Sequence, residues 1–268
     1  MNSLALYRTL SYLRHHFLAW NTGGEGIHSP SLFYIVHYLF PKQHRYYVWD
    51  SIEERRKAML CAPKPISITD YGTGKDSVLQ VRQIARKHLE SRETDELFFK
   101  LIVHLRHELK RPLRIVELGT SLGITTAYLA TAAKDNEVIT FEGNEPTLEM
   151  AKLNWKKLGI NNIEAVLGNI DLTLNKARIC ADEKPIDFVF MDANHRYEPT
   201  LRYFDTLVQK VHSKSIVVVD DIHYSPEMNR AWQDLKNRPQ VTSSIDCYTF
   251  GMLFFDEHYI KRHYTIRL

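Results

Sequence analysis

One stretch decides the fold of this chain: Arg114-Ile-Val-Glu117-Leu-Gly119-Thr-Ser121-Leu-Gly123-Ile-Thr-Thr-Ala-Tyr-Leu-Ala130. Apolar residues dominate from Leu113 to Leu118, which is typical of a strand that is covered on both faces. Gly119 and Gly123 allow a tight turn and a close approach of the backbone to a ligand. A helical pattern begins at Ile124, above the carboxyl end of the strand. Strand, turn and helix in this order predict a unit that binds a nucleotide-like cofactor.

A second predicted strand, residues 137–142, ends in the carboxylate of Glu142, nineteen residues after Gly123. In a doubly wound sheet, the ribose of a bound nucleotide lies at this point. A nicotinamide fingerprint, G-x-G-x-x-G, is excluded because Ser121 and Ile124 stand where its second and third glycines belong. Glu117 would also repel a pyrophosphate. The pattern present, E-x-G-x-x-x-G, therefore favours a cofactor without one.

This pattern resembles motif I of the class I S-adenosylmethionine-dependent methyltransferases. The resemblance implies that S-adenosylmethionine is the cofactor and that Glu142 binds its ribose. The methionine end of that cofactor carries an ammonium group, so the acid Glu117 is tolerated there. The predicted cofactor-binding residues are Glu117, Gly119, Ser121, Gly123, Glu142, Asn169 and Asp192.

The second half of the chain alternates predicted strands with helical patterns. Further strands are expected at residues 163–167, 186–192, 215–220, 241–248 and 251–255. Such alternation requires parallel strands with right-handed crossovers, and ligands bind at their carboxyl ends, where Asn169, Asp192 and Asp220 fall. The last two strands would form an antiparallel edge. The prediction is an α/β fold with a doubly wound, mostly parallel sheet that resembles the seven-stranded methyltransferase sheet over residues 95–268.

Within that family, the likeness is greatest to the small-molecule O-methyltransferases that use a divalent metal. It is carried by Asp187-Phe-Val-Phe-Met-Asp192-Ala-Asn-His195 and Val217-Val-Val-Asp220-Asp221. Catechol-type enzymes have D-A-D-K and D-N at these strand ends, whereas sugar-directed relatives carry a D-D pair at the second. The resemblance implies metal ligands at Asp192, Asp220 and Asp221, and catalytic residues at Asp192 and His195. His195 stands where those enzymes have a lysine, which puts catechol in doubt as the substrate.

The chemistry of these side chains independently supports a cation. Neighbouring parallel strands lie about 4.8 Å apart, so carboxylates at two adjoining strand ends can converge on one ion. Without a cation the clustered aspartates would repel each other. Oxygen ligands favour Mg²⁺ or another hard divalent cation over zinc. Two alternatives stay open: Asp221 can cap the next segment, and His195 can be a surface residue.

Length and composition bound the class of protein. With 268 residues and 44% hydrophobic content, the chain can bury one sizeable core and an appended subdomain. Its three cysteines are scattered, which argues against a disulfide framework or a structural zinc site and favours a cytoplasmic protein. No apolar run is long enough to span a membrane. The net charge of +3 is too small to predict nucleic-acid binding.

Residues 1–94 differ from the rest, being helical and aromatic. Eleven of the thirty aromatic residues lie within residues 1–50. Three explanations stay open, namely a helical cap on the main domain, a lid over the substrate and a surface for a homodimer. Gly23-Gly-Glu-Gly26-Ile-His28-Ser-Pro30 divides the beginning of this region into two helices. His28 is interpreted as a turn or core histidine rather than a catalytic one.

A second glycine-rich stretch, residues 66–75, does not fit a phosphate loop. A Walker A loop needs glycine where Thr69 stands and serine or threonine where Asp76 stands. The chain about twenty residues further on is helical, so the acid-ended strand of a nucleotide unit is missing as well. The stretch is interpreted as a connector.

Together these features predict a cytoplasmic methyltransferase that acts on an oxygen of a small molecule, assisted by a divalent metal or by His195 as base. One alternative is a metal-independent N-methyltransferase of a small molecule or protein. An alternative of another class is a regulatory or scaffold protein that binds S-adenosylmethionine without turnover.

Overall fold

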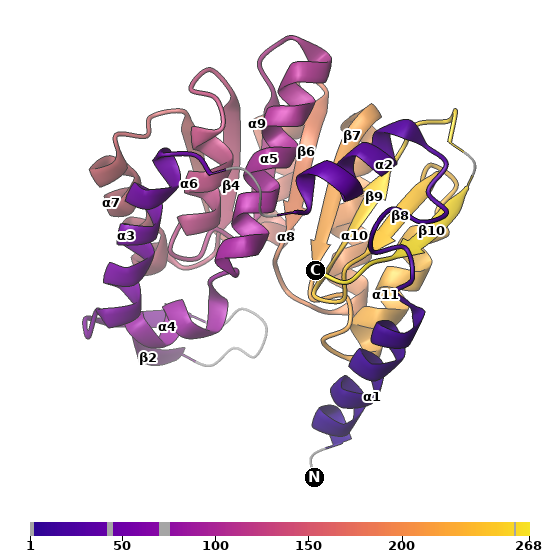
Figure 1. Ribbon diagram of the computed structural model, residues 1–268. Coiled ribbons are helices and arrows are strands. Elements are labelled where there is room, and N and C mark those ends of the chain that lie inside the picture. The colour runs from indigo at the N-terminus through magenta and orange to yellow at the C-terminus, as the bar shows by residue number, and fades with distance from the viewer. Residues whose placement is uncertain (1–2, 42–44, 70–75, 260) are drawn as a thin grey trace. The chain divides into compact units, whose positions relative to one another are not determined.

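The computed structural model describes residues 3–41, 45–69, 76–259 and 261–268 (Figure 1). The chain forms two compact units, one from Met1–Pro41 together with Asp182–Leu268 and one from Lys42–Ala181. Each unit combines strands with flanking helices. The predicted division between residues 94 and 95 stays a prediction.

The unit Lys42–Ala181 contains a helical layer and three parallel strands. Its elements are α3 (Val48–Cys61), β1 (Pro65–Thr69), β2 (Asp76–Gln80), α4 (Val81–His88), α5 (Arg92–Leu109), β3 (Arg114–Leu118), α6 (Ile124–Thr131), β4 (Glu137–Glu142), α7 (Glu145–Leu158), β5 (Ile163–Leu167), α8 (Ile170–Thr173), the 3₁₀-helix η2 (Leu174–Lys176) and α9 (Arg178–Ala181). β3 pairs with β4, and β4 with β5, both in parallel. The carboxyl ends of all three strands therefore meet at one edge.

Four helices of this unit share an apolar core. Its buried members come from α3, α5, α6 and α7: Trp49, Ile52, Phe99, Ile124, Ala127, Tyr128, Leu148, Ala151 and Trp155. Local signals set the helix ends. The Ser91 side chain accepts a hydrogen bond from Thr94 N at the start of α5, and Asn144 caps α7 in the same way. Because β3 is buried throughout, its apolar sequence matches its environment.

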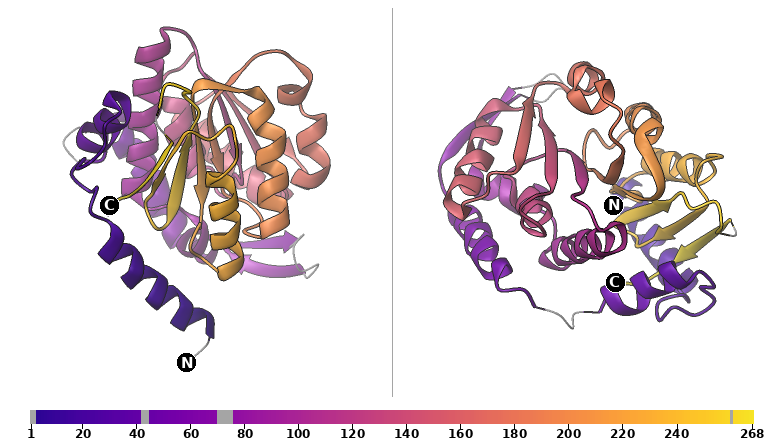
Figure 2. Two further views of the ribbon diagram at one scale, coloured as in Figure 1. Left: turned by 90° about the vertical axis from the view of Figure 1, so that its right-hand side faces the viewer. Right: turned by 90° about the horizontal axis from the view of Figure 1, so that it is seen from above.

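The other unit combines the N-terminal helices with the C-terminal strands. Its elements are α1 (Ser3–Leu18), α2 (Pro30–Tyr34), the π-helix η1 (Ile35–Leu39), β6 (Ile186–Met191), α10 (Tyr197–Leu207), η3 (Val208–Lys210), β7 (Val211–Asp220), α11 (Pro226–Lys236), β8 (Ser243–Asp246), β9 (Phe250–Phe254) and β10 (Arg262–Thr265). β6 and β7 are parallel, β9 runs antiparallel to β7 and β8, and β10 is parallel to β8. α10 and α11 lie on one side of these strands, and α2 lies on the other (Figure 2). The predicted break between two N-terminal helices is confirmed.

The α/β fold with a largely parallel strand arrangement is confirmed, but the strand count is not. Beyond the β1–β2 hairpin, the described residues form eight strands, five in one unit and three in the other, instead of seven. The additional strand is β10, whose sequence Arg262-His-Tyr-Thr265 has two exposed polar residues and no apolar run. The stretch interpreted as a connector, residues 66–75, includes all of β1 except its first residue, and β2, which pairs antiparallel with β1, begins directly after it. Its glycines, Gly72 and Gly74, lie outside the described residues.

The aromatic N-terminal residues do not share one environment. Trp49 is buried in the core described above. In contrast, Phe17, Trp20 and Tyr47 have 82%, 66% and 91% of their surface exposed. The cap, lid and homodimer explanations therefore stay predictions.

In the described part of the chain, no helix is both long and apolar enough to cross a membrane.

Candidate active-site residues

The loop after β3 has the backbone conformation that its glycines predicted. Gly119, Ser121 and Gly123 have φ angles of +101°, +49° and +72°. Such values favour glycine, and at Ser121 they require support from the surroundings. The support comes from β4, because the amides of Gly119 and Thr120 both donate to the Phe141 carbonyl, at 3.0 and 3.1 Å. The loop is therefore held against the end of the neighbouring strand.

Glu142 fixes this loop from the carboxyl end of β4. Its Oε2 accepts a hydrogen bond from the Ser121 amide at 2.9 Å, and its Oε1 accepts one from the Asn144 amide at 2.8 Å. The carboxylate is thus oriented by two backbone donors and stays partly accessible. Each carboxylate oxygen can accept a further hydrogen bond. A ribose has the neighbouring hydroxyl groups that would supply such donors.

Glu117 and Gly123 have buried positions. Glu117 is fully buried, and its Oε2 accepts hydrogen bonds from Thr126 Oγ1 at 2.5 Å and Thr140 Oγ1 at 2.6 Å. It therefore joins β3 to α6 and β4. At Gly123, a Cβ atom would lie 2.5 Å from Nε1 of Trp155. This glycine lets α6 pack closely on α7, a structural role that the sequence pattern alone did not separate from cofactor contact.

Asn169 lies at the carboxyl end of β5, next to the end of β4. The amide of the preceding Gly168, whose φ is +130°, donates to the Glu142 carbonyl at 2.9 Å. The Asn169 side chain accepts from the Asp171 amide at 2.9 Å and so caps the short helix α8. The predicted cofactor residues from 117 to 169 are therefore brought together at one edge of β3, β4 and β5.

These groups fit the polar part of S-adenosylmethionine. The Ser121 hydroxyl is buried and has no hydrogen-bond partner among the described residues. A buried polar atom of this kind is satisfied when a ligand or water supplies the missing bond. The Glu142 carboxylate beside the same loop offers hydrogen-bond acceptors to a ribose. The Ser121 hydroxyl can bond to a further polar group of the cofactor.

A second group of predicted residues lies in the other unit, after β6 and β7. Asp192, His195 and Asp220 each place one potential ligand atom within 4.8 Å of the others. Asn194, His195 and Asp221 have φ angles of +65°, +21° and +55°. Non-glycine residues with positive φ cost backbone free energy and concentrate at functional sites. Both loops are thus strained where the predicted side chains converge.

The electrostatics of this group are those of crowded acids. Nε2 of His195 lies 3.4 Å from Oδ1 of Asp192, and its Nδ1 lies 3.7 Å from Oδ2 of Asp221. The pKa of Asp192 is raised to about 6, chiefly by burial and also by the charge of Asp221, against the opposing effect of His195. Burial also raises the pKa of Asp221. A hard divalent cation would relieve this crowding, because the donor set consists of carboxylate oxygens beside one imidazole.

Two residues near this group were not predicted. The guanidinium of Arg8 on α1 lies 3.9 Å from the centre of the Tyr224 ring, and its Nε donates to the Tyr224 carbonyl at 2.9 Å. The Tyr224 ring centre lies 6.1 Å from that of His195. Against the larger effect of burial, Arg8 also lowers the pKa of Asp221. Only the fold brings Arg8 next to a segment more than two hundred residues away, so no sequence motif could have identified it.

Comparison with known proteins identifies the type of domain. Residues 116–222 match the family model described as a methyltransferase domain. This part of the chain is a methyltransferase domain. Every predicted cofactor, catalytic and metal residue, from Glu117 to Asp221, lies inside the matched range.

Known proteins similar to this methyltransferase domain include one curated relative and several solved structures. The relative, protein-L-isoaspartate O-methyltransferase from Hahella chejuensis, is 41% identical over 59 residues, or 22% of this chain and 27% of its own length. The chain therefore spans only about a quarter of that relative. An O-methyltransferase from Bacillus cereus in complex with SAH has a TM-score of 0.57 at 16% identity, covering 80% of this chain and 93% of its own.

Another similar structure is the O-methyltransferase TomG from Streptomyces achromogenes, in complex with SAM. It has a TM-score of 0.54 at 17% identity and covers 95% of this chain and 99% of its own. At such identities the likeness establishes the fold that these proteins share with the methyltransferase domain.

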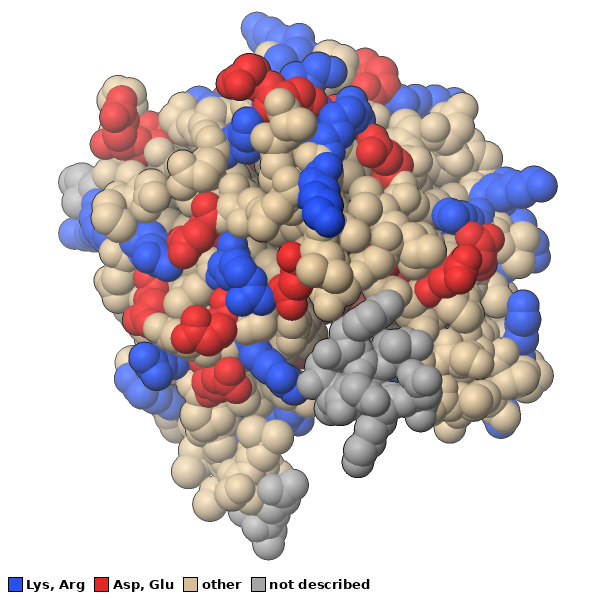
Figure 3. All heavy atoms as spheres, turned by 180° about the vertical axis from the view of Figure 1, so that it is seen from behind, with Lys and Arg blue, Asp and Glu red and all other residues tan. Residues whose placement is uncertain are grey.

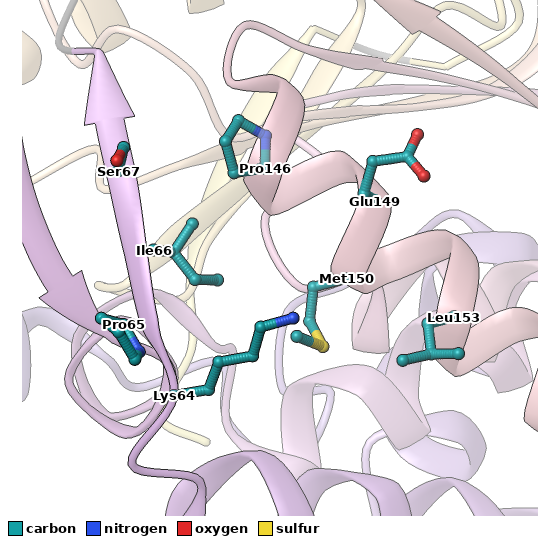
Figure 4. A pocket seen from close by; sticks show the side chains of 8 residues that line it. All are labelled: Lys64, Pro65, Ile66, Ser67, Pro146, Glu149, Met150 and Leu153. Carbon is teal, nitrogen blue, oxygen red and sulfur yellow. The ribbon is translucent and has the colours of Figure 1, made fainter.

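One hollow of the structure lies apart from these residues. A pocket of about 360 Å³ opens between the β1 side of the hairpin and α7 (Figure 4). Its lining consists of Lys64, Pro65, Ile66, Ser67, Pro146, Glu149, Met150 and Leu153. None of these belongs to the predicted site of the methyltransferase domain.

On the face shown in Figure 3, acidic and basic side chains are interspersed rather than gathered into one basic patch.

The hydrogen bonds of Glu142 lead to a prediction for cofactor affinity. Glu142→Ala is expected to weaken binding of S-adenosylhomocysteine by about 1–3 kcal/mol, because it removes a charged acceptor and leaves the Ser121 amide without its partner. Isothermal titration calorimetry measures the change. Glu149→Ala is the matched control, since Glu149 lies on exposed α7 surface beside the separate pocket. Equal affinities of wild type and Glu142→Ala would exclude Glu142 as a cofactor residue.

Proposed function

We propose that this protein is an S-adenosylmethionine-dependent methyltransferase that methylates an oxygen of a small molecule. The observation that carries the proposal is the position of Glu142, which is oriented by backbone amides beside the glycine loop of a methyltransferase domain. The names of the similar proteins support O-methylation, since the Hahella, Bacillus and Streptomyces proteins are all described as O-methyltransferases.

The predicted cofactor residues would act chiefly by positioning. Glu142 would accept hydrogen bonds from the ribose hydroxyls, and the loop from Gly119 to Gly123 would contact the methionine part. In the reaction, the methyl group is transferred from the sulfonium sulfur to the acceptor oxygen. S-adenosylhomocysteine is the second product. Holding the two reacting atoms in line can contribute several kcal/mol to lowering the barrier.

The acids after β6 and β7 would prepare the acceptor. Asp192, Asp220 and Asp221 are the residues that would hold a hard divalent cation, which when bound would orient the acceptor hydroxyl and lower its pKa. His195 would take the hydroxyl proton, since its ring lies between the carboxylates of Asp192 and Asp221. A small-molecule acceptor, a cytoplasmic location and a homodimer are parts of the same proposal.

Ligand binding tests the proposal first. S-adenosylmethionine and S-adenosylhomocysteine are expected to raise the melting temperature of the protein, whereas NAD and ATP are expected to leave it unchanged, because Glu117 and Glu142 disfavour a polyphosphate near the loop. Stabilisation by NAD or ATP alone would refute the cofactor assignment. A panel of hydroxyl, carboxyl and amine acceptors with a labelled methyl donor then separates O- from N-methylation. Tight S-adenosylhomocysteine binding without transfer to any acceptor would favour a regulatory protein.

A further inference from the structure

Three side chains far apart in the sequence meet in the unit that contains α1. His15 lies on α1, His223 follows β7, and Asp246 ends β8. Nδ1 of His15 lies 3.3 Å from Oδ1 of Asp246, and Nε2 of His223 lies 3.1 Å from the same oxygen. One ligand atom of each residue therefore lies within 4.8 Å of the other two. None of them belongs to the predicted active site.

We propose that His15, His223 and Asp246 form a second metal site, which binds a Zn²⁺-type ion. Zinc is bound by imidazole nitrogens and carboxylate oxygens at about 2.0–2.2 Å in tetrahedral geometry, which places neighbouring ligand atoms about 3.3 Å apart. The distances of 3.3 and 3.1 Å from Asp246 to the two imidazoles match this spacing. A water molecule would complete the coordination.

The proton on His15 is placed by its neighbours. Nε2 lies 3.0 Å from the Ile266 carbonyl, which can only accept, so this nitrogen carries the hydrogen. In the neutral ring, Nδ1 then presents its lone pair toward Asp246. His15 is only 6% exposed, and its Nδ1 has no hydrogen-bond partner within the described ranges of the chain. A buried lone pair aimed at a carboxylate is unfavourable unless a cation lies between them.

The outer contacts resemble those of zinc ligands in general. A metal-binding histidine commonly donates its other ring N–H to a backbone carbonyl, as His15 does to Ile266. Asp246 is held by the indole of Trp232, whose Nε1 donates to Oδ2 at 3.0 Å, and by the Tyr248 amide, which donates to Oδ1 at 3.1 Å. These bonds would keep the carboxylate in place when the ion is removed.

His223 is oriented as well. Its ring stacks on that of Tyr248 with a centroid distance of 5.2 Å. Its Nδ1 lies 3.3 Å from the Ser11 hydroxyl and 2.8 Å from the Asn229 side-chain amide. With its hydrogen on Nδ1, His223 can donate to the Ser11 hydroxyl, or to the Asn229 side-chain oxygen once that amide is turned over. The lone pair of Nε2 is then available for the ion.

The chemistry of this site differs from that of the acids after β6 and β7. Two imidazoles favour a transition metal such as zinc, whereas a set of aspartates favours Mg²⁺. Because the three ligands come from α1, the segment after β7 and β8, a bound ion would fasten the N-terminal helix to the C-terminal strands. We therefore assign the site a structural role.

Calorimetry with Zn²⁺ tests the proposal, using the Asp220→Ala variant as background so that the predicted hard-cation site is absent. The expected result is about one Zn²⁺ per chain, with affinity lowered at least about 100-fold by His223→Gln and by His15→Gln. The matched control is His16→Gln, because His16 is the exposed neighbour of His15 on the same helix. It is expected to bind Zn²⁺ as the background does.

Limited proteolysis gives a second readout that does not depend on activity. Zn²⁺ is expected to slow cleavage between α1 and α2 in the background and in His16→Gln, but not in His223→Gln. If His15→Gln fails to fold, His223→Gln decides the question, since it leaves α1 unchanged. Unchanged Zn²⁺ affinity in His223→Gln would overturn the proposal. Absence of any Zn²⁺ binding would do so too, and would identify His15 and Asp246 as a simple ion pair.

Discussion

Gly119→Val is expected to abolish detectable binding of S-adenosylhomocysteine, lowering its affinity by at least about 100-fold. Gly119 has a φ of +101°, which a β-branched side chain strongly disfavours. Valine would shift the turn whose amides at residues 119 and 120 bond to the Phe141 carbonyl. The branched side chain would also occupy space next to the loop where the cofactor backbone is expected. Calorimetry measures the affinity, and circular dichroism verifies the fold.

Gly159→Val separates cofactor contact from backbone strain. Gly159 also has a positive φ, +67°, but it ends α7, and a Cβ atom added there would meet nothing within 4 Å among the described residues beyond its own helix and chain neighbours. Valine there should cost folding stability through its left-handed conformation while leaving S-adenosylhomocysteine affinity unchanged. If both variants lose stability to the same extent and both still bind the ligand, the loop after β3 does not contact the cofactor.

Strands that contain apolar runs could be predicted from the sequence. β4 and β5 have the predicted bounds, and β6 is one residue shorter, because continuous apolar runs define their cores. Where strands carry polar residues, the prediction was incomplete. β7 begins at Val211, four residues before the predicted start, since Val211-His-Ser-Lys214 has no apolar run. β10 was missed for the same reason.

The candidate site divides in a similar way. Glu142 and the loop after β3 could be predicted because strand, turn and acid follow each other at short spacing. Arg8 and the pair His15 and Asp246 could not, because their neighbours are set by the packing of α1 on strands more than two hundred residues later. Burial lowers the pKa of His15, and Asp246 opposes this effect, so even its charge depends on that packing.

Chelation is expected to reduce methyl transfer at least about 100-fold while leaving S-adenosylhomocysteine affinity largely intact. The physical reason is that Asp192, Asp220 and Asp221 would orient the acceptor through a cation, whereas the cofactor would be held by the loop after β3 and Glu142. EDTA would also remove zinc from the proposed His15 site. The experiment therefore adds back Mg²⁺ without Zn²⁺, so that any recovery of activity is due to the hard-cation site. Initial rates before and after dialysis, with calorimetry on the same samples, measure both quantities.

Asp220→Ala is expected to reproduce the effect of chelation in a single variant. Its activity should fall to the level of the EDTA-treated protein, and added Mg²⁺ should not restore it. Asp205→Ala is the matched control, because Asp205 pairs with Arg238 on the surface and its side chain is 51% exposed. A purely structural role predicts a different result: Asp220→Ala would lower the melting temperature, and chelators would change nothing. Full activity in excess EDTA, with no divalent ion bound to the purified protein, would exclude the metal and favour N-methylation.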